Sequence, residues 1–281
     1  MPTATQTVKP VVYNRVPRVT ADFWLIKLMA VTMGETAADY LNVQMGLGLT
    51  ATSLIMSAIL AGALVWQFAQ EKYVPAAYWL SVVLISIVGT LITDNLVDNF
   101  HVPLLDTTIA FSIALALTFL LWFQTERTLS IHSIFTSRRE AFYWLAILFT
   151  FALGTAAGDL VAEKFALGYL ATGVLFGMII ISLSLGYFFF GLDPILGFWL
   201  VYILTRPLGA SFGDLMSQPM QYGGLGFGTI ITSAIFLAAI VVIVVFMSLR
   251  QEGEELGDVD ADDKLATANE GERLATAEEE L

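Results

Sequence analysis

The chain has 281 residues, of which 57% are hydrophobic and only 14% are charged, and its mean hydropathy is +0.75. Soluble globular domains are about 45–50% apolar and about 25% charged, so this composition predicts a protein whose solvent is lipid. Cysteine is absent, which excludes disulfides, thiolate zinc sites, iron–sulfur clusters and cysteine nucleophiles.

The net charge of −12 belongs to the C-terminal tail rather than to the body of the chain. Residues 251–281 contain 12 acidic and 2 basic residues, whereas residues 1–250 contain 13 acidic and 11 basic residues. The tail is too acidic and too poor in large apolar residues to fold alone, so we expect residues 249–281 to be disordered. The near-neutral body has no basic patch with interleaved aromatic residues, so nucleic acid is not an expected partner.

Apolar runs of about 20 residues, the length that crosses a hydrocarbon core, occur eight times along the chain. The expected spans are 22–43, 47–69, 76–98, 104–124, 141–163, 166–190, 194–217 and 224–248. Residues 1–20 are polar and basic and lack the apolar stretch of a signal peptide. We therefore expect an all-α integral membrane protein with eight transmembrane helices, a membrane domain over residues 21–248, and cytoplasmic segments over 1–20 and 249–281.

The orientation follows from the basic residues in short loops. With the N-terminus inside, only Lys164 lies in an outer loop, whereas eight basic residues lie in cytoplasmic segments. These eight are Lys9, Arg15, Arg18, Lys72, Arg127, Arg138, Arg139 and Arg250. The bias predicts a multi-pass protein of the inner (plasma) membrane with both termini in the cytoplasm.

An aromatic–Trp pair occurs four times, and each Trp is followed by Gly ten residues later and by Asp fifteen residues later. The three sets are Trp24, Trp79, Trp144 and Trp199; Gly34, Gly89, Gly154 and Gly209; and Asp39, Asp94, Asp159 and Asp214. The pattern predicts four two-helix repeats in two halves of two, at about 21–70, 76–124, 141–190 and 194–248. Because each repeat has two helices, all four enter from the same side, which predicts parallel repeats related by an axis along the membrane normal.

This fourfold pattern resembles a family of bacterial multi-pass membrane proteins built from four tandem two-helix repeats of unknown function, each with a characteristic Trp. The resemblance covers about residues 17–248 and leaves out the acidic tail. It implies the architecture only, and it supplies neither a reaction nor a substrate.

The repeat places Trp and Asp at different depths. Each Trp is expected near the cytoplasmic interface, where its ring serves as an anchor. At about 1.5 Å per residue, each Asp lies roughly 22 Å further along, in the outer half of the hydrocarbon region. Residues one helical turn from the Asp share its face and carry further oxygens, at Glu35, Thr90, Thr155, Asp98 and Glu163. The repeat glycines form a stripe of small residues next to this polar stripe on each helix. Small residues at this spacing predict close helix packing, with the polar faces turned inward.

Carboxylates at membrane depth are costly and point to function by default. We therefore expect a transporter or channel for a small hard cation, either a proton or a divalent metal ion. The expected cation-binding residues are Asp39, Asp94, Asp159, Asp214, Glu35, Asp98, Glu163, Thr90 and Thr155. Lys27 and Arg206 also lie within spans and are candidate charge partners. In the alternative interpretation they neutralise two of the acids as structural ion pairs.

Two alternatives remain open at the level of sequence. One is a proton-coupled transporter of an organic solute recognised by Arg206, and the other is a scaffold or sensor that does not transport. The chain lacks a phosphate-binding loop and the HExxH, GxSxG and Rossmann motifs, so we expect neither an enzyme nor a cofactor. The expected partners are the lipid bilayer and a small cation or solute, and homo-oligomerisation is left open.

Overall fold

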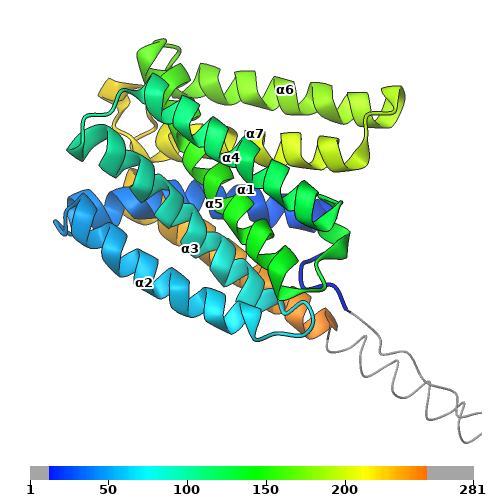
Figure 1. Ribbon diagram of the computed structural model, residues 1–281. Helices are drawn as coiled ribbons and strands as arrows, with labels where there is room; N and C mark the ends of the chain where they lie inside the picture. The colour runs from blue at the N-terminus through cyan, green and yellow to red at the C-terminus, as the bar shows by residue number, and fades with distance from the viewer. Residues whose placement is uncertain (1–12, 252–281) are drawn as a thin grey trace, which may run out of the picture.

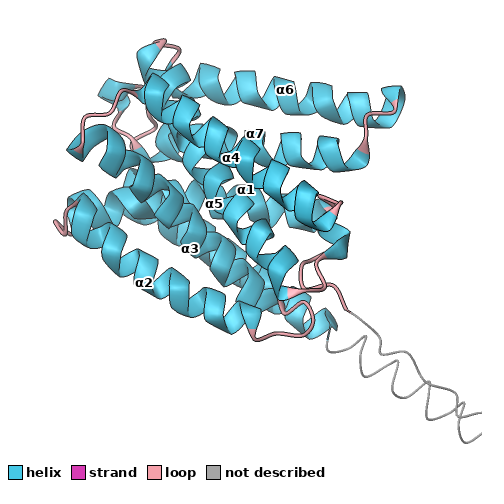
Figure 2. Ribbon diagram, viewed as in Figure 1, coloured by secondary structure: helices cyan, strands magenta, loops and turns pink. Residues whose placement is uncertain are grey.

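The computed structural model describes residues 13–251, and this part of the chain is helical without a strand (Figures 1 and 2). Its long helices are α1 (Ala21–Asp39), α2 (Leu49–Phe68), α3 (Pro75–Asp94), α4 (Leu104–Glu126), α5 (Ser137–Asp159), α6 (Gly168–Phe190), α7 (Pro194–Ser217) and a C-terminal helix (Gly228–Gln251). The expected spans agree closely with these bounds. The expectations for the tail beyond residue 251 and for residues 1–12 lie outside the described residues.

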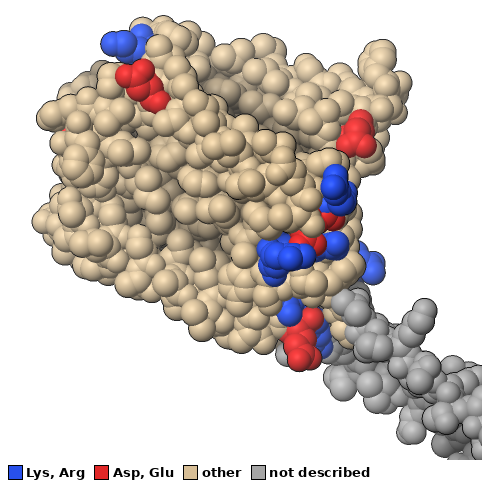
Figure 3. Space-filling model, viewed as in Figure 1, with Lys and Arg blue, Asp and Glu red and all other residues tan. Residues whose placement is uncertain are grey.

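Seven of these eight helices are long and apolar enough to cross a membrane. The exception is α1, in which Asp22, Lys27, Glu35 and Asp39 lower the hydropathy. On the face shown in Figure 3, charged side chains gather toward opposite ends of the molecule and leave a broad uncharged belt between them. Helices of this length and composition are those of an all-α membrane protein.

The odd-numbered helices form a closed ring in which α1 packs on α3, α3 on α5, α5 on α7, and α7 on α1. The other helices cover this ring: α2 packs chiefly on α3, α4 on α5, and α6 on α7. The C-terminal helix reaches α1, where the hydroxyl oxygens of Thr36 and Ser233 are 2.7 Å apart. The second helix of each repeat thus packs on the first helix of the next repeat, so no repeat can bury its apolar surface alone.

The repeat glycines let the ring helices approach closely. A Cβ added at any of the four would lie less than 3.0 Å from a side chain on the next helix of the ring. The pairs and distances are Gly34–Ser86 at 2.0 Å, Gly89–Phe151 at 2.7 Å, Gly154–Arg206 at 2.3 Å and Gly209–Val31 at 2.6 Å. In each pair the contacted residue lies seven positions after the Trp of the following repeat. The glycine of the fourth repeat contacts the first repeat in the same way, which closes the ring. The predicted close packing of the small stripe is confirmed.

Local signals fix where the ring helices begin. Thr20 and Thr136 cap α1 and α5 by accepting a hydrogen bond from a backbone N–H three residues on. Asp193 caps α7, and both α3 and α7 carry Pro at their start, where the missing N–H costs nothing. Ring contacts join residues near the starts of neighbouring helices, namely Phe23–Trp79, Tyr78–Trp144, Tyr143–Trp199 and Trp24–Phe198. All four helices therefore start at the same end of the ring, which we name the Trp end.

The opposite end, named the Asp end, has an irregular backbone. Directly after their repeat Asp, α1, α3 and α5 change to π-helical turns, namely η1 (Tyr40–Gln44), η2 (Asn95–Asn99) and η4 (Leu160–Lys164). The fourth repeat instead ends α7 at Ser217 and continues into the short 3₁₀ turn η5 (Met220–Tyr222). Gly224 lies in this loop, where a Cβ would be 2.0 Å from the backbone oxygen of Gln218, so only glycine fits.

The glycine contacts yield a test of the ring. Gly89→Ala should lower the free energy of unfolding by about 1–3 kcal/mol, because its Cβ would overlap Phe151 and overpacking costs this much. Gly62→Ala in α2 is the control, since nothing lies within 4 Å of that position. Thermal unfolding in detergent measures both variants, and equal midpoints would contradict the packing.

Candidate functional site

Equivalent residues of the four repeats form successive layers inside the ring, one helical turn apart. From the Asp end inward these are the Asp layer (Asp39, Asp94, Asp159, Asp214), the Glu35 layer (Glu35, Thr90, Thr155, Ala210), the Arg206 layer (Val31, Ser86, Phe151, Arg206) and the Lys27 layer (Lys27, Val82, Ile147, Tyr202). The spacing of four residues keeps each stripe on one helix face, as the sequence predicted. The layers set the chemistry along the ring interior.

Arg206 joins its own helix to the other three ring helices. Its Nη2 donates to Glu35 Oε2 at 2.7 Å and to Thr155 Oγ1 at 2.8 Å, and it also contacts Thr90 Oγ1. Its Nη1 donates to the backbone oxygen of Val31 at 3.0 Å. The side chain is fully buried, so the Glu35 carboxylate neutralises a charge that water does not reach.

Two glycines on α5 make room for this arginine. A Cβ at Gly154 would lie 2.4 Å from Arg206 Cβ, and a Cβ at Gly158 would lie 3.4 Å from Pro207 Cβ. The guanidinium then enters the Glu35 layer, where α7 itself contributes only Ala210. Small residues on two helices therefore admit one large side chain from the fourth repeat.

Lys27 is buried, and no carboxylate of the described residues contacts it. Its ammonium group donates to Thr205 Oγ1 at 2.7 Å and to the backbone oxygen of Tyr202 at 3.2 Å. The Nζ atom also lies 3.8 Å from the centroid of the Tyr202 ring and 5.0 Å from that of Phe151. Of the two candidate charge partners, Arg206 pairs with an acid, whereas Lys27 pairs with none in residues 13–251. Cation–π contacts and neutral oxygens take the place of an ion pair at Lys27.

The carboxylates become more exposed toward the Asp end. Glu35 is 6% exposed, whereas Asp39 and Asp94 are half-buried. One turn further out, Asp98 and Glu163 are exposed. Solvent therefore reaches the carboxylates from the Asp end, while the Arg206 and Lys27 layers beneath them are sealed.

None of the four Asp side chains accepts a hydrogen bond or forms an ion pair within the described part of the chain. Each one instead experiences the charge of Glu35 and of at least one further acid, and Asp159 also experiences Arg206. The Asp layer therefore holds several carboxylates that repel one another, and among the described residues Arg206 is the cation that acts on it, at Asp159. In residues 13–251 no three His, Cys, Asp or Glu side chains are placed to hold a metal ion.

The π-helical turns were not predicted, since nothing in the sequence distinguishes them from α-helix. Each begins at the residue after Asp39, Asp94 or Asp159, so the carboxylate sits where the helix widens. A π-helical turn loosens the regular backbone hydrogen bonding and is frequently found at functional sites. Asp214 lacks this turn and is 9% exposed.

The structure brings Glu35, Thr90 and Thr155 together as expected, but around Arg206. Their oxygens contact the guanidinium, and Thr90 Oγ1 also donates to Glu35 Oε2 at 3.2 Å. The Asp layer lies one turn further out, and Asp98 and Glu163 lie at the surface beyond it. Arg206 therefore separates the exposed acids from the sealed interior.

The prediction that the repeat Trp residues are interfacial anchors is wrong for Trp79, Trp144 and Trp199, which are at most 4% exposed. Their indole N–H groups donate within the protein, to Tyr73 Oη at 3.1 Å, Glu140 Oε1 at 3.4 Å and the Leu129 backbone oxygen at 2.9 Å. Because these donors are satisfied internally, the rings pack into the core.

A second buried acid, Glu140, lies at the Trp end and was not identified from the sequence. It accepts from Arg15 Nη1 and from Gln67 Nε2, each at 2.9 Å, and it is fully buried. Nearby, the hydroxyl oxygens of Tyr78 and Tyr143 are 2.5 Å apart. These groups close the Trp end beneath the Lys27 layer.

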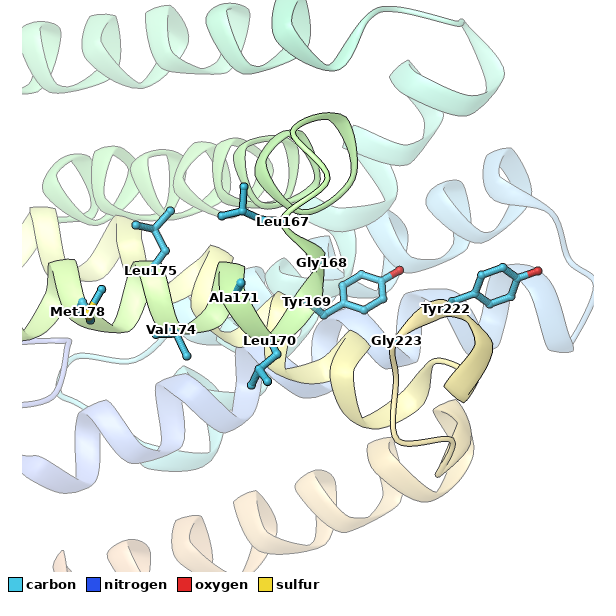
Figure 4. Close-up of a pocket in the computed structure, with 10 residues that line it drawn as sticks. All are labelled: Leu167, Gly168, Tyr169, Leu170, Ala171, Val174, Leu175, Met178, Tyr222 and Gly223. Atoms are coloured by element: carbon cyan, nitrogen blue, oxygen red, sulfur yellow. The ribbon is translucent and has the colours of Figure 1, made fainter.

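A groove of about 570 Å³ at the Asp end lies outside these layers. It runs along α6, and its walls are mostly apolar, with Leu170, Val174 and Met178 among them. Figure 4 shows Tyr169 and Tyr222 with their hydroxyl groups pointing away from these apolar side chains. None of the layer residues lines this groove, so it is separate from the charged interior.

The buried ion pair yields a prediction. Arg206→Gln should destabilise the protein by about 3–5 kcal/mol, because Glu35 is left buried and unpaired. The double variant Glu35→Gln/Arg206→Gln should cost less than the two single variants together. Arg138→Gln, which breaks a contact of a mostly exposed arginine with Glu126, should cost at most about 1 kcal/mol. Unfolding in detergent measures all four, and additive single effects would mean that the pair is not coupled.

Comparison with known proteins identifies the architecture and leaves the activity open. The family model described as Repeat of Unknown Function (DUF347) matches four times, at residues 23–73, 77–128, 142–191 and 197–252. Neither the curated proteins nor the solved structures give a significant match. The four matches cover most of the chain and agree with the four repeats of the ring. The protein therefore belongs to the DUF347 family of four-repeat proteins.

Proposed function

We propose that this protein is a membrane transporter for a small cation, either a proton or a hard divalent metal ion, and that its Asp layer takes up the cation. The observation that carries the proposal is the set of four carboxylates without a hydrogen bond or ion pair inside residues 13–251. Like charges in a poorly solvated place repel one another, and a bound proton or cation relieves that repulsion. Carboxylate oxygens are also the ligands that hard cations prefer.

Arg206 is the proposed barrier on the path. A cation that moves from the Asp layer toward the Trp end meets a fixed guanidinium and then Lys27, both fully buried. Passage therefore requires Arg206 to leave its contacts with Glu35 and the two threonines. This arrangement favours a carrier that alternates between states over an open channel.

The Asp layer and Arg206 are coupled by charge. When no cation is bound, the negative carboxylates of the Asp layer attract the Arg206 guanidinium in competition with Glu35. Asp159 already experiences the charge of Arg206. A bound cation neutralises the Asp layer and removes this attraction, so cation binding changes which position the Arg206 side chain prefers. The π-helical turns directly after three of the Asp residues are the proposed moving parts, because their backbone is the least regular in the ring.

We also propose that α1 crosses the membrane with the other seven helices, since it occupies an equal place in the ring. The glycine contacts repeat cyclically through all four repeats. They support parallel repeats with pseudo-fourfold symmetry about the membrane normal. The Trp end is then cytoplasmic and the Asp end is outside, in the inner (plasma) membrane of a bacterium.

Purified protein in liposomes tests the transport proposal. We expect uptake of protons, Mg²⁺, Mn²⁺ or Ca²⁺ by the wild type, measured with internal indicator dyes with and without a pH gradient. Asp94→Asn and Asp159→Asn should abolish it, because each Asp is followed one turn on by another acid, Asp98 or Glu163. Asp214→Asn should be milder, since Gln218 occupies that next position.

The control is Asp22→Asn, which removes an exposed carboxylate at the Trp end. Uptake in Asp94→Asn and Asp159→Asn equal to that in this control would overturn the proposed role of the Asp layer. Uptake of a carboxylate-bearing solute that depends on Arg206, without cation uptake, would favour the organic solute transporter. No flux of any tested species would favour the scaffold or sensor.

The proposed topology has its own test. A reporter that works only in the cytoplasm should be active when it is fused after Leu281, because eight crossings return the chain to the cytoplasmic side on which it starts. A paired fusion in the loop after Lys164 should give the opposite result. A C-terminal reporter on the outside would contradict the eight crossings.

A further inference from the structure

The four repeat Trp residues are equivalent in sequence but differ in their hydrogen bonds. Three of their indole N–H groups donate to acceptors inside the protein, as described above. The indole N–H of Trp24 has no acceptor within residues 13–251, and its ring is only half-buried. The first repeat therefore leaves open, at the Trp end, a donor that the other repeats satisfy.

Trp24 lines a cavity of about 520 Å³. The cavity lies between the starts of α1 and α7, the end of α6, and the loop between α4 and α5. That loop contributes Ser130 and His132, and the His132 imidazole makes no hydrogen bond inside the described residues. The lining therefore includes polar groups with unused hydrogen-bonding capacity, from the start of α1 and from this loop.

The α6 side of the cavity is apolar and aromatic. It is formed by Leu183, Tyr187 and Phe188, with Ser184 as the one small polar residue that α6 adds, and Tyr187 and Phe188 are 46% and 74% exposed. The apolar window of α6 is the least buried among the seven membrane-length helices of the described chain, so this wall lies on the outside of the helix bundle, where a bilayer would surround it. Among residues 13–251, no Lys or Arg lines the cavity. The cavity is therefore amphipathic, with a largely apolar α6 side and neutral hydrogen-bond donors elsewhere in its lining.

We propose that this cavity binds a glycerophospholipid. A phosphodiester or ester oxygen accepts the Trp24 N–H beside Ser130 and His132, and an acyl chain lies along Tyr187 and Phe188. Because no Lys or Arg of the described residues lines the cavity, recognition rests on the glycerophosphate and ester groups common to these lipids. The site is independent of the Asp layer and of the transport proposal.

Two pairs of variants test the site in the full-length protein. Trp24→Phe removes the N–H and keeps an aromatic ring, and its control, Trp66→Phe, changes an exposed Trp on α2. Ser184→Phe fills the cavity, and its control, Ser182→Phe, lies on the same helix outside the lining. Both serines donate to the backbone oxygen four residues earlier, so each substitution removes the same kind of hydrogen bond from α6.

Binding is measured by native mass spectrometry of delipidated protein titrated with dioleoyl phosphatidylcholine, phosphatidylethanolamine or phosphatidylglycerol. We expect one tightly held lipid with little preference among the three headgroups. Trp24→Phe should bind about threefold to tenfold more weakly, the effect of one neutral hydrogen bond. Ser184→Phe should lose the lipid, while both controls bind as the wild type does.

Wild-type binding by both Trp24→Phe and Ser184→Phe would overturn the proposal. So would binding of phosphatidylglycerol alone, which would place the lipid on a basic surface instead. Inorganic phosphate is the last probe, and its binding in place of the lipids would make the cavity an anion site and refute the lipid assignment.

Discussion

The buried guanidinium of Arg206 is the interaction on which the interior depends. A charge without water needs a counter-charge and a full set of acceptors, and here they come from α1, α3 and α5 together. Arginine suits this place because its planar, permanently charged fork presents five donors in fixed directions. A single side chain of the fourth repeat therefore fixes the spacing of the four ring helices, and Gly154 must stay small to admit it.

This interaction also divides the ring interior into an acidic region on one side and a basic region on the other. Toward the Asp end the chain places carboxylates that are partly open to solvent, and toward the Trp end it places Lys27 among aromatic rings. Glu35 lies at the boundary and is held by Arg206. In the proposed transport cycle, the carboxylates concentrate cations at the mouth while the positive charges below oppose free passage.

Four similar repeats yield a ring whose specialised features occur once each. Arg206 has Val31, Ser86 and Phe151 as its counterparts, and Lys27 faces Tyr202 across the join between the first and last repeats. The fourth repeat also replaces the π-helical turn with a glycine-rich loop. These differences from the repeat pattern cluster where α7 meets α1. The ring closes at this point, so side chains of the first and fourth repeats must pack against each other there. The cavity beside Trp24 lies at the same join.

The sequence by itself determined the repeats, the helix bounds and the inward polar stripes, because apolar length and one-turn spacing are local properties of the chain. It also determined that the glycines pack closely, since small residues recurring in register serve few other purposes in lipid. Tertiary structure alone decided that Arg206 pairs with Glu35, which lies 171 residues away, and that Lys27 pairs with no acid in residues 13–251. It likewise decided that Trp79 is buried while Trp24 borders a cavity, although both occupy the same repeat position. These outcomes depend on which side chains of different helices contact one another in the closed ring. The spacing of residues along one helix does not predict those contacts.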